Sequence, residues 1–178
     1  LISVLLGAFI IGVAIGSLLC AKISGPQVEP GLIPFGAIGL TLFSADLFFA
    51  STNYQLANAA VTAVMPMQFL SLSGGVRIFV DLAAIGMFGG MFIVPLYAMV
   101  QSRTQSHKRA RVIAANNVFN ALFMVSGALI GIVCLSIVQM TIPQFFALMS
   151  GANLLFLALL VWRVPEFKLR FLAVITNN

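Results

Sequence analysis

Three ionisable residues lie within or beside long apolar stretches of this chain: Asp46, Arg77 and Asp81. Charges are costly inside a bilayer, so those that persist there usually pair or carry function. Arg77 and Asp81 are four residues apart, a spacing that places them on one face of a helix, where they can pair. An arginine there can bind a phosphate, and a carboxylate can bind an amine or carry a proton. The alternative is an ion pair that pins two helices, and for Asp46 we expect that structural role or a part in ion coupling.

A stripe of asparagines forms the second candidate group: Asn116, Asn117 and Asn120. Spacings of three and four residues place them on one side of a helix. Buried amides need hydrogen-bond partners, which a water-lined cavity or a neighbouring helix can supply. We take Asn116 and Asn120, together with Arg77 and Asp81, as candidate substrate-binding residues.

The remaining reactive side chains form no catalytic or metal-binding pattern. His107 stands among basic residues and is expected to be solvated, while Cys20 and Cys134 lie in apolar runs without a CxxC spacing. The sequence contains no glycine-rich phosphate loop and no Ser-His-Asp arrangement. We therefore expect no enzymatic activity in this chain, no cofactor and no metal.

The elements that must position these residues are membrane helices. The chain is 61% hydrophobic and 7% charged, with a mean hydropathy of +1.12, whereas soluble domains carry about 25% charged residues. An apolar run of about 20 residues can cross a bilayer as a helix. We predict an all-α integral membrane protein whose helical bundle occupies residues 1–162, followed by a cytoplasmic tail over 163–178. The predicted spans are 1–21, 33–50, 76–100, 112–138 and 144–162.

Proline positions support these limits. Pro34 and Pro143 stand at predicted helix starts, where proline is tolerated, and Pro165 follows a predicted end. Pro95 lies inside a span, which predicts a kink.

The basic residues predict the orientation of the chain. Eight of the nine Lys and Arg residues, all except Arg77, fall at Lys22, in the 101–111 loop or in the 163–170 tail. Short basic loops face the cytoplasm, so the N-terminus is expected outside and the C-terminus inside. The net charge of +5 then reflects topology rather than nucleic-acid binding. A further span within 51–74 would break this pattern, so we predict an exterior interfacial or re-entrant segment there.

Small residues indicate where helices touch. Ala8, Gly12 and Gly16 form one line at helical spacing, and Gly127 and Gly131 form another. Such lines let helix backbones approach closely in lipid. The same spacing is also compatible with surfaces that slide during a transport cycle.

Four segments resemble a known family. Residues 12–25 (GVAIGSLLCAKISG) and 31–40 (GLIPFGAIGL) are similar to helices eight and nine of major facilitator transporters. Residues 94–103 (VPLYAMVQSR) and 111–120 (RVIAANNVFN) extend the likeness. Together they resemble bacterial lysophospholipid transporters, especially the transporter part of proteins in which it is fused to an acyltransferase.

The resemblance implies a function and partners. The spans would be helices eight to twelve, preceded by an N-terminal transporter half and helix seven. The implied activity moves lysophospholipids, such as lysophosphatidylethanolamine, from the outer to the inner leaflet of the bacterial inner membrane for re-acylation. The tail over 163–178 could link to an acyltransferase, but the acyltransferase signature, a His followed four residues later by Asp, does not occur here: Arg111 stands four residues after His107.

Two other functions remain open at this point. One is transport of a small solute or drug within the same superfamily. The other is a membrane anchor that holds a fused acyltransferase at the bilayer. An anchor needs no polar stripe, so the asparagines argue against it.

Overall fold

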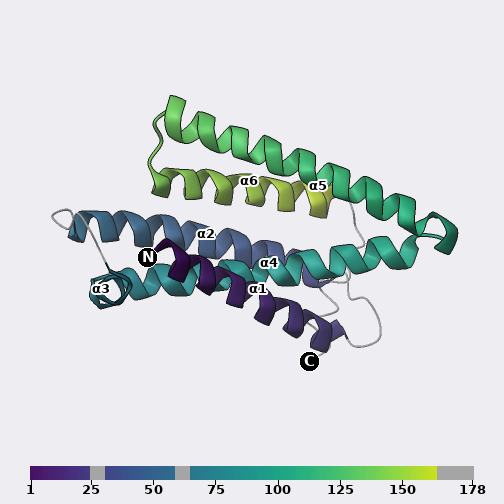
Figure 1. Cartoon of the computed structure of the whole chain (residues 1–178), viewed down its shortest axis with the longest axis horizontal. Coiled ribbons are helices and arrows are strands. Elements are labelled where there is room, and N and C mark those ends of the chain that lie inside the picture. The colour runs from purple at the N-terminus through teal and green to yellow at the C-terminus, as the bar shows by residue number, and fades with distance from the viewer. Residues whose placement is uncertain (25–30, 59–64, 164–178) are drawn as a thin grey trace.

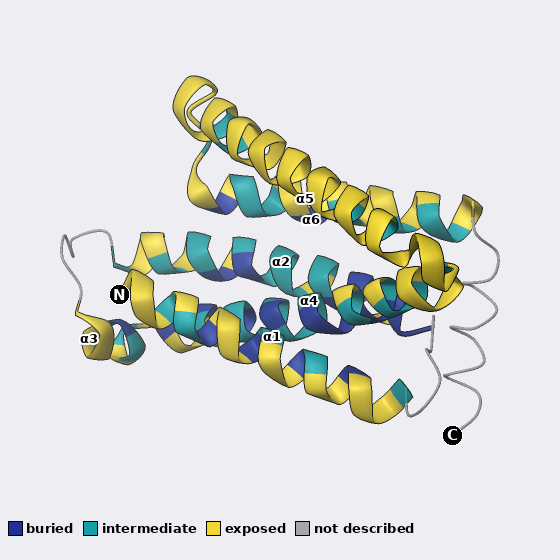
Figure 2. Cartoon of the chain, turned by 45° about the vertical axis from the view of Figure 1, so that its right-hand side comes forward, coloured by how far each residue is buried: buried dark blue, intermediate teal, exposed yellow. Residues whose placement is uncertain are grey.

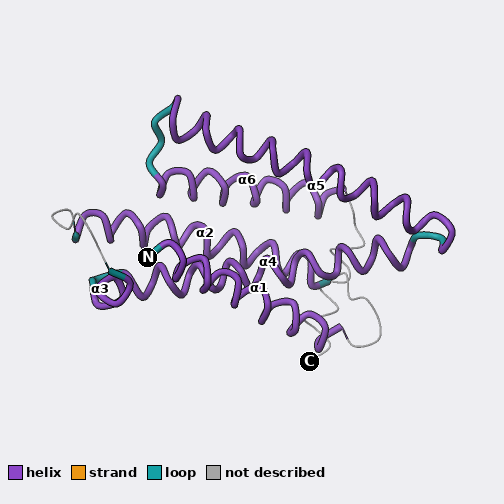
Figure 3. The backbone as a smooth tube through the Cα atoms, in the orientation of Figure 1, coloured by secondary structure: helices purple, strands orange, loops and turns teal. Residues whose placement is uncertain are grey.

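The computed structural model describes residues 1–24, 31–58 and 65–163, and every regular element in these ranges is helical (Figure 3). In chain order the elements are α1 (Ile2–Ser24), α2 (Leu32–Ala57), α3 (Pro66–Ser71), α4 (Gly75–Arg103), the 3₁₀ turn η1 (Ser106–Lys108), α5 (Arg109–Ile132), the π-helical turn η2 (Val133–Ile137) and α6 (Ile142–Arg163). Five helices in the described ranges are long and apolar enough to cross a membrane, as a multi-pass membrane protein requires.

The predicted helix limits hold to within a few residues except at the end of α2. That helix continues through Ser51 to Ala57, where we predicted an end at residue 50. The hydroxyl groups of Ser51 and Thr52 donate to the carbonyl oxygens one turn earlier, on Leu47 and Phe48. These bonds satisfy the polar side chains inside the helix, so the fall in hydropathy does not end it.

The segment 51–74 is not a further span within the described residues. Its first part belongs to α2, and its last part contains α3, a helix of six residues that is far too short to cross a bilayer. Residues 59–64, which join the two parts, lie outside the described ranges, as do Pro165 and the predicted tail from residue 164 onward.

Two predicted helix starts at proline are confirmed. Pro143 is the second residue of α6 and Pro34 the third residue of α2, positions whose backbone nitrogen needs no partner within the helix. Pro95 lies inside α4, as predicted, and is buried there; the kink expected at this position stays a prediction.

Helix α4 lies at the centre of the packing. It contacts α1 and α2, and α2 in turn packs against α6 (Figure 1). The buried residues concentrate on the facing sides of α1, α2 and α4, while their outer faces are exposed (Figure 2). Leu47, Phe69 and Ile78 form one cluster at the end near α3, and Cys20, Leu32 and Met91 form another at the opposite end.

Glycines bring α1 and α4 into backbone contact. A side chain at Gly12 or Gly16 would run into the main chain of α4 at Ala83 or Met87. In return, a side chain at Gly86 would meet the main chain of Phe9. The predicted contact through the Ala8, Gly12 and Gly16 line is therefore confirmed, with α4 as its partner.

Helix α5 differs from the others because none of its residues is buried (Figure 2). Gly127 and Gly131, the second predicted small-residue line, have open space where a side chain would project. The exposed apolar residues that dominate α5 after its asparagine stripe suit a lipid or protein environment rather than water.

Basic residues gather at one end of the bundle. Helices α1, α4 and α6 run in one direction and end toward the right in Figure 1, and the turn from α4 to α5 lies at the same end of the bundle. Their last turns carry Lys22, Arg103 and Arg163. The grouping on which the predicted orientation depends is therefore present in the fold.

Candidate functional site

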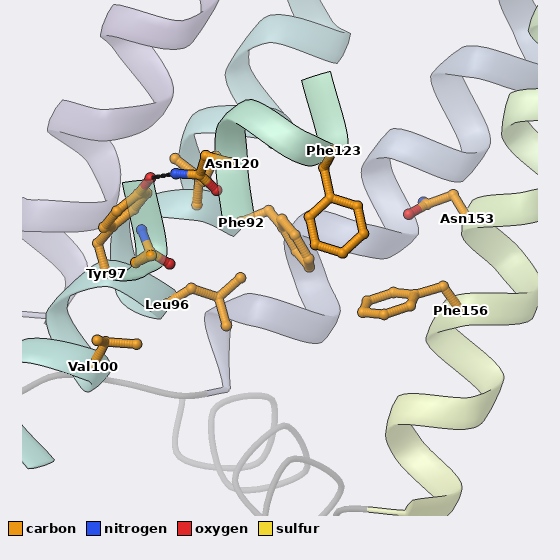
Figure 4. Close-up of a pocket in the computed structure, with 10 residues that line it drawn as sticks. Phe92, Leu96, Tyr97, Val100, Asn120, Phe123, Asn153 and Phe156 are labelled. Atoms are coloured by element: carbon orange, nitrogen blue, oxygen red, sulfur yellow. Dashed lines mark hydrogen bonds between the residues drawn. The ribbon is translucent and has the colours of Figure 1, made fainter. Parts of the chain in front are cut away.

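A cleft of about 490 Å³ lies where α4, α5 and α6 approach each other (Figure 4). It is lined by Phe92, Ile93, Leu96, Tyr97 and Val100 from α4, by Asn116, Asn120 and Phe123 from α5, and by Asn153 and Phe156 from α6. Two of the predicted site residues, Asn116 and Asn120, are thus brought together in one cleft.

The polar side of this cleft centres on Asn120. Its side-chain amide nitrogen donates a hydrogen bond to the hydroxyl oxygen of Tyr97 on α4 (Figure 4). Asn116 stands one helical turn earlier on α5 and lines the same cleft. Asn120 therefore forms an interhelical hydrogen bond, and Asn116 and Asn120 both contribute polar groups to the lining of the cleft. Both alternatives that the sequence left open are present.

Asn153 is a polar lining residue that the sequence analysis missed. Its amide nitrogen donates to the carbonyl oxygen of Ala37 and to the hydroxyl oxygen of Thr41, both at 2.8 Å, and so ties α6 to α2. One turn away, Ser150 donates to the carbonyl oxygen of Thr41 at 2.9 Å. The sequence did contain a signal for this contact, namely an asparagine three residues after a serine within an apolar span. Polar groups inside a membrane usually face protein, so this pair indicated a face that contacts another helix.

The other side of the cleft is aromatic and aliphatic. Phe92, Phe123 and Phe156 come from three different helices and lie around the same space, with Leu96 beside them (Figure 4). The cleft therefore combines a broad apolar wall with amide and phenol groups at one side. An amphiphile with a polar end and an apolar chain has this same division.

The charged candidates form a second group, at the α3 end of α4. Two nitrogens of the Arg77 guanidinium donate to the two carboxylate oxygens of Asp46 on α2, with the Nε–Oδ2 distance at 3.0 Å. The sequence allowed Arg77 either to pair with Asp81 on its own helix or to pin two helices, and in the structure it reaches across to Asp46 on α2. This bidentate pair satisfies both oxygens of one carboxylate and fixes the geometry between the two helices.

Asp81 completes this group without a salt bridge of its own. Its side chain is 2% exposed, and its Oδ2 is buried with no hydrogen-bond partner. It lies close enough to Asp46 and Arg77 to interact electrostatically with both. The predicted cluster of one cation and two carboxylates is therefore present.

The two groups cannot contact one ligand headgroup at the same time. Arg77 and Tyr97 are 20 positions apart on one helix, which corresponds to about 30 Å along its axis. The four predicted substrate-binding residues thus divide into an asparagine cleft and a charged cluster.

No family model, curated protein or solved structure matches this chain. The geometry of the cleft and of the charged cluster therefore carries the functional argument. Among the described residues, no group of three or more His, Cys, Asp or Glu side chains is placed to hold a metal ion. Cys20 and Cys134 are both free thiols, and His107 is exposed in the η1 turn.

Proposed function

We propose that this chain is the C-terminal part of a major facilitator transporter that moves lysophospholipids from the outer to the inner leaflet of a bacterial inner membrane. The observation that carries the proposal is the cleft between α4, α5 and α6, with Asn116, Asn120 and Tyr97 beside an aromatic wall. Re-acylation would follow on the cytoplasmic side, by a fused or associated acyltransferase.

The chemistry of the cleft suits a lipid with one acyl chain. A zwitterionic headgroup leaving water needs hydrogen-bond partners, because unpaired polar groups are expensive in apolar surroundings. Amide and phenol groups supply donors and acceptors without adding a net charge. The phenylalanines offer the acyl chain an apolar surface, and a volume of about 490 Å³ falls within the usual range for small-molecule sites.

The position of the cleft agrees with release toward the cytoplasm. Asn116 lies two turns from the start of α5, at the basic end of the bundle. Under the positive-inside rule that end faces the cytoplasm. The polar wall would then stand in the inner half of the pathway, where a headgroup leaves.

Transport by asparagine variants tests the proposal. The full-length transporter would be reconstituted in liposomes and assayed for lysophosphatidylethanolamine movement between leaflets. We expect Asn116→Leu with Asn120→Leu to reduce movement at least tenfold, because the headgroup loses its amide partners. Asn117→Leu is the matched control, since Asn117 is an exposed neighbour on α5 that does not line the cleft. It should transport like the wild type.

The contrary outcomes are equally specific. Lower thermal stability of the double variant, with transport per folded molecule unchanged, would reduce both asparagines to structural roles. Wild-type protein that moves a small soluble solute or drug but no lysophospholipid would favour the other transporter function. Protein that moves neither while it holds an active acyltransferase at the membrane would favour the anchor.

A further inference from the structure

We propose that Asp81 is a proton-binding site, and that Arg77 exchanges its carboxylate partner between Asp46 and Asp81 as the proton leaves and returns. The inference rests on the charged cluster at the α3 end of α4 and is independent of the lipid proposed for the cleft. It assigns a ligand, the proton, to a buried carboxyl group whose Oδ2 has no hydrogen-bond partner.

The first step is a balance of charges around Asp81. The cluster contains two carboxyl groups and one guanidinium, and the guanidinium is already bound to Asp46 through two of its nitrogens. An ionised Asp81 would leave one negative charge uncompensated in a side chain that is 2% exposed. Burying such a charge costs several kcal/mol, whereas a protonated carboxyl is neutral. The arrangement described here therefore fits the protonated form.

The second step considers the titratable groups on each helix that packs near Asp81. From α2 the titratable groups are Asp46 and, two turns further on, Tyr54, whose buried hydroxyl has no hydrogen-bond partner. From α4 itself the group is Arg77. Helix α1 carries Cys20 and Lys22, both at its opposite end, and α3 carries no charged residue. Arg77 is thus the basic side chain among the described residues that is near enough to neutralise an ionised Asp81.

The third step is the movement that proton release permits. Arg77 and Asp81 lie one turn apart on the same face of α4, so the guanidinium can reach Asp81 without a change in the helix. When it does, the ion pair between α2 and α4 opens and Asp46 is left to solvent, where its side chain is already 39% exposed. When the proton returns, Arg77 returns to Asp46 and the two helices are joined again.

A metal cation fits this site less well than a proton. Hard cations such as Ca²⁺ gather about six or more oxygen ligands. The cluster offers two carboxyl groups, and no described group of three or more acidic or other metal-ligating side chains surrounds them. A guanidinium beside the carboxylates would also repel a second cation.

Infrared difference spectroscopy of the full-length protein in lipid bilayers tests the proposal. The C=O stretch of a protonated carboxyl is followed as the pH is raised, in wild type and three variants. Wild type should show the band and lose it with rising pH. Asp81→Asn should lack it, Arg77→Gln should keep it, and Asp46→Asn should show less of it at the same pH, because the freed guanidinium pairs with Asp81.

The variants also control for folding. Asparagine has the shape of a neutral carboxyl, so Asp81→Asn should unfold at the wild-type temperature. A pH-dependent band that survives Asp81→Asn would overturn the proposal, as would a strong loss of thermal stability in that variant, which would mark Asp81 as a charged structural residue. A band that changes when Na⁺ is replaced by choline at constant pH would assign the site to a metal cation instead. Lipid movement enters none of these measurements, so failure here leaves the proposed transport function intact.

Discussion

The Arg77 guanidinium joins two helices through one carboxylate, although both partners are partly open to their surroundings. Its two donated bonds match the planar fork of an arginine. Lysine has the same charge but cannot reproduce this geometry. The shape of the side chain at position 77 therefore matters as well as its positive charge.

Exchange of the two charges tests the pair directly. We expect Arg77→Ala to lower the unfolding temperature, because it leaves both carboxyl groups of the cluster without a cation. Asp46→Ala should lower it less, because the freed guanidinium can pair with Asp81. Arg77→Lys should fall between alanine and wild type. The double variant Arg77→Asp with Asp46→Arg should recover stability relative to Arg77→Asp alone, as measured by thermal unfolding in detergent. If the effects of Arg77→Asp and Asp46→Arg on the unfolding free energy simply add in the double variant, the contact contributes nothing to stability.

At the scale of the helices, the glycine contact between α1 and α4 can be tested by substitution. Replacing Gly16 with alanine pushes a methyl group into the main chain of Met87, and overpacking of this kind typically costs about 1–3 kcal/mol. Gly7→Ala is the control on the same helix, because a side chain there meets no atom within 4 Å. The free energy of unfolding, measured with a chemical denaturant, should therefore be lower for Gly16→Ala than for wild type. For Gly7→Ala it should equal or exceed the wild-type value. Equal effects would contradict close contact at Gly16.

The helices were largely predictable from the sequence, whereas the partner of each contacting face was not. Hydropathy is a local property, so the apolar runs located the long helices to within a few residues. The same property missed Ser51–Ala57, where polar side chains bond to their own helix. Partner choice depends on residues far apart in the chain, such as Asp46 with Arg77 or Thr41 with Asn153. No spacing rule along one helix contains that information.

The candidate site shows the same division. The Asn116 and Asn120 spacing predicted a shared face, and both line the cleft. Tyr97 and the phenylalanines that complete it are ordinary members of apolar spans and carry no signal of their own in the sequence. Their role follows only from the way in which α4, α5 and α6 approach each other.

At the scale of the whole molecule, the clustering of basic residues predicts which end faces the cytoplasm. In a variant without Cys20 and Cys134, a cysteine at exposed Met67 in α3 should react with a membrane-impermeant thiol reagent added outside intact cells. A cysteine at Gln105, in the basic turn between α4 and α5, should react only after the cells are opened. Both should label equally in detergent, and the reverse order in intact cells would invert the orientation.

The backbone contact between α1 and α4 also bears on how this pair behaves once the lipid is removed. Carbonyl oxygens of Ala83, Met87 and Phe9 stand where the side chains of Gly12, Gly16 and Gly86 would project, so each glycine turns a Cα–H toward an oxygen. Such weak hydrogen bonds contribute about 0.5–1 kcal/mol each. They depend on the close distance between the two backbones and not on bound lipid. The α1–α4 pair should therefore stay associated in mild detergents that strip the annular lipids from the rest of the bundle.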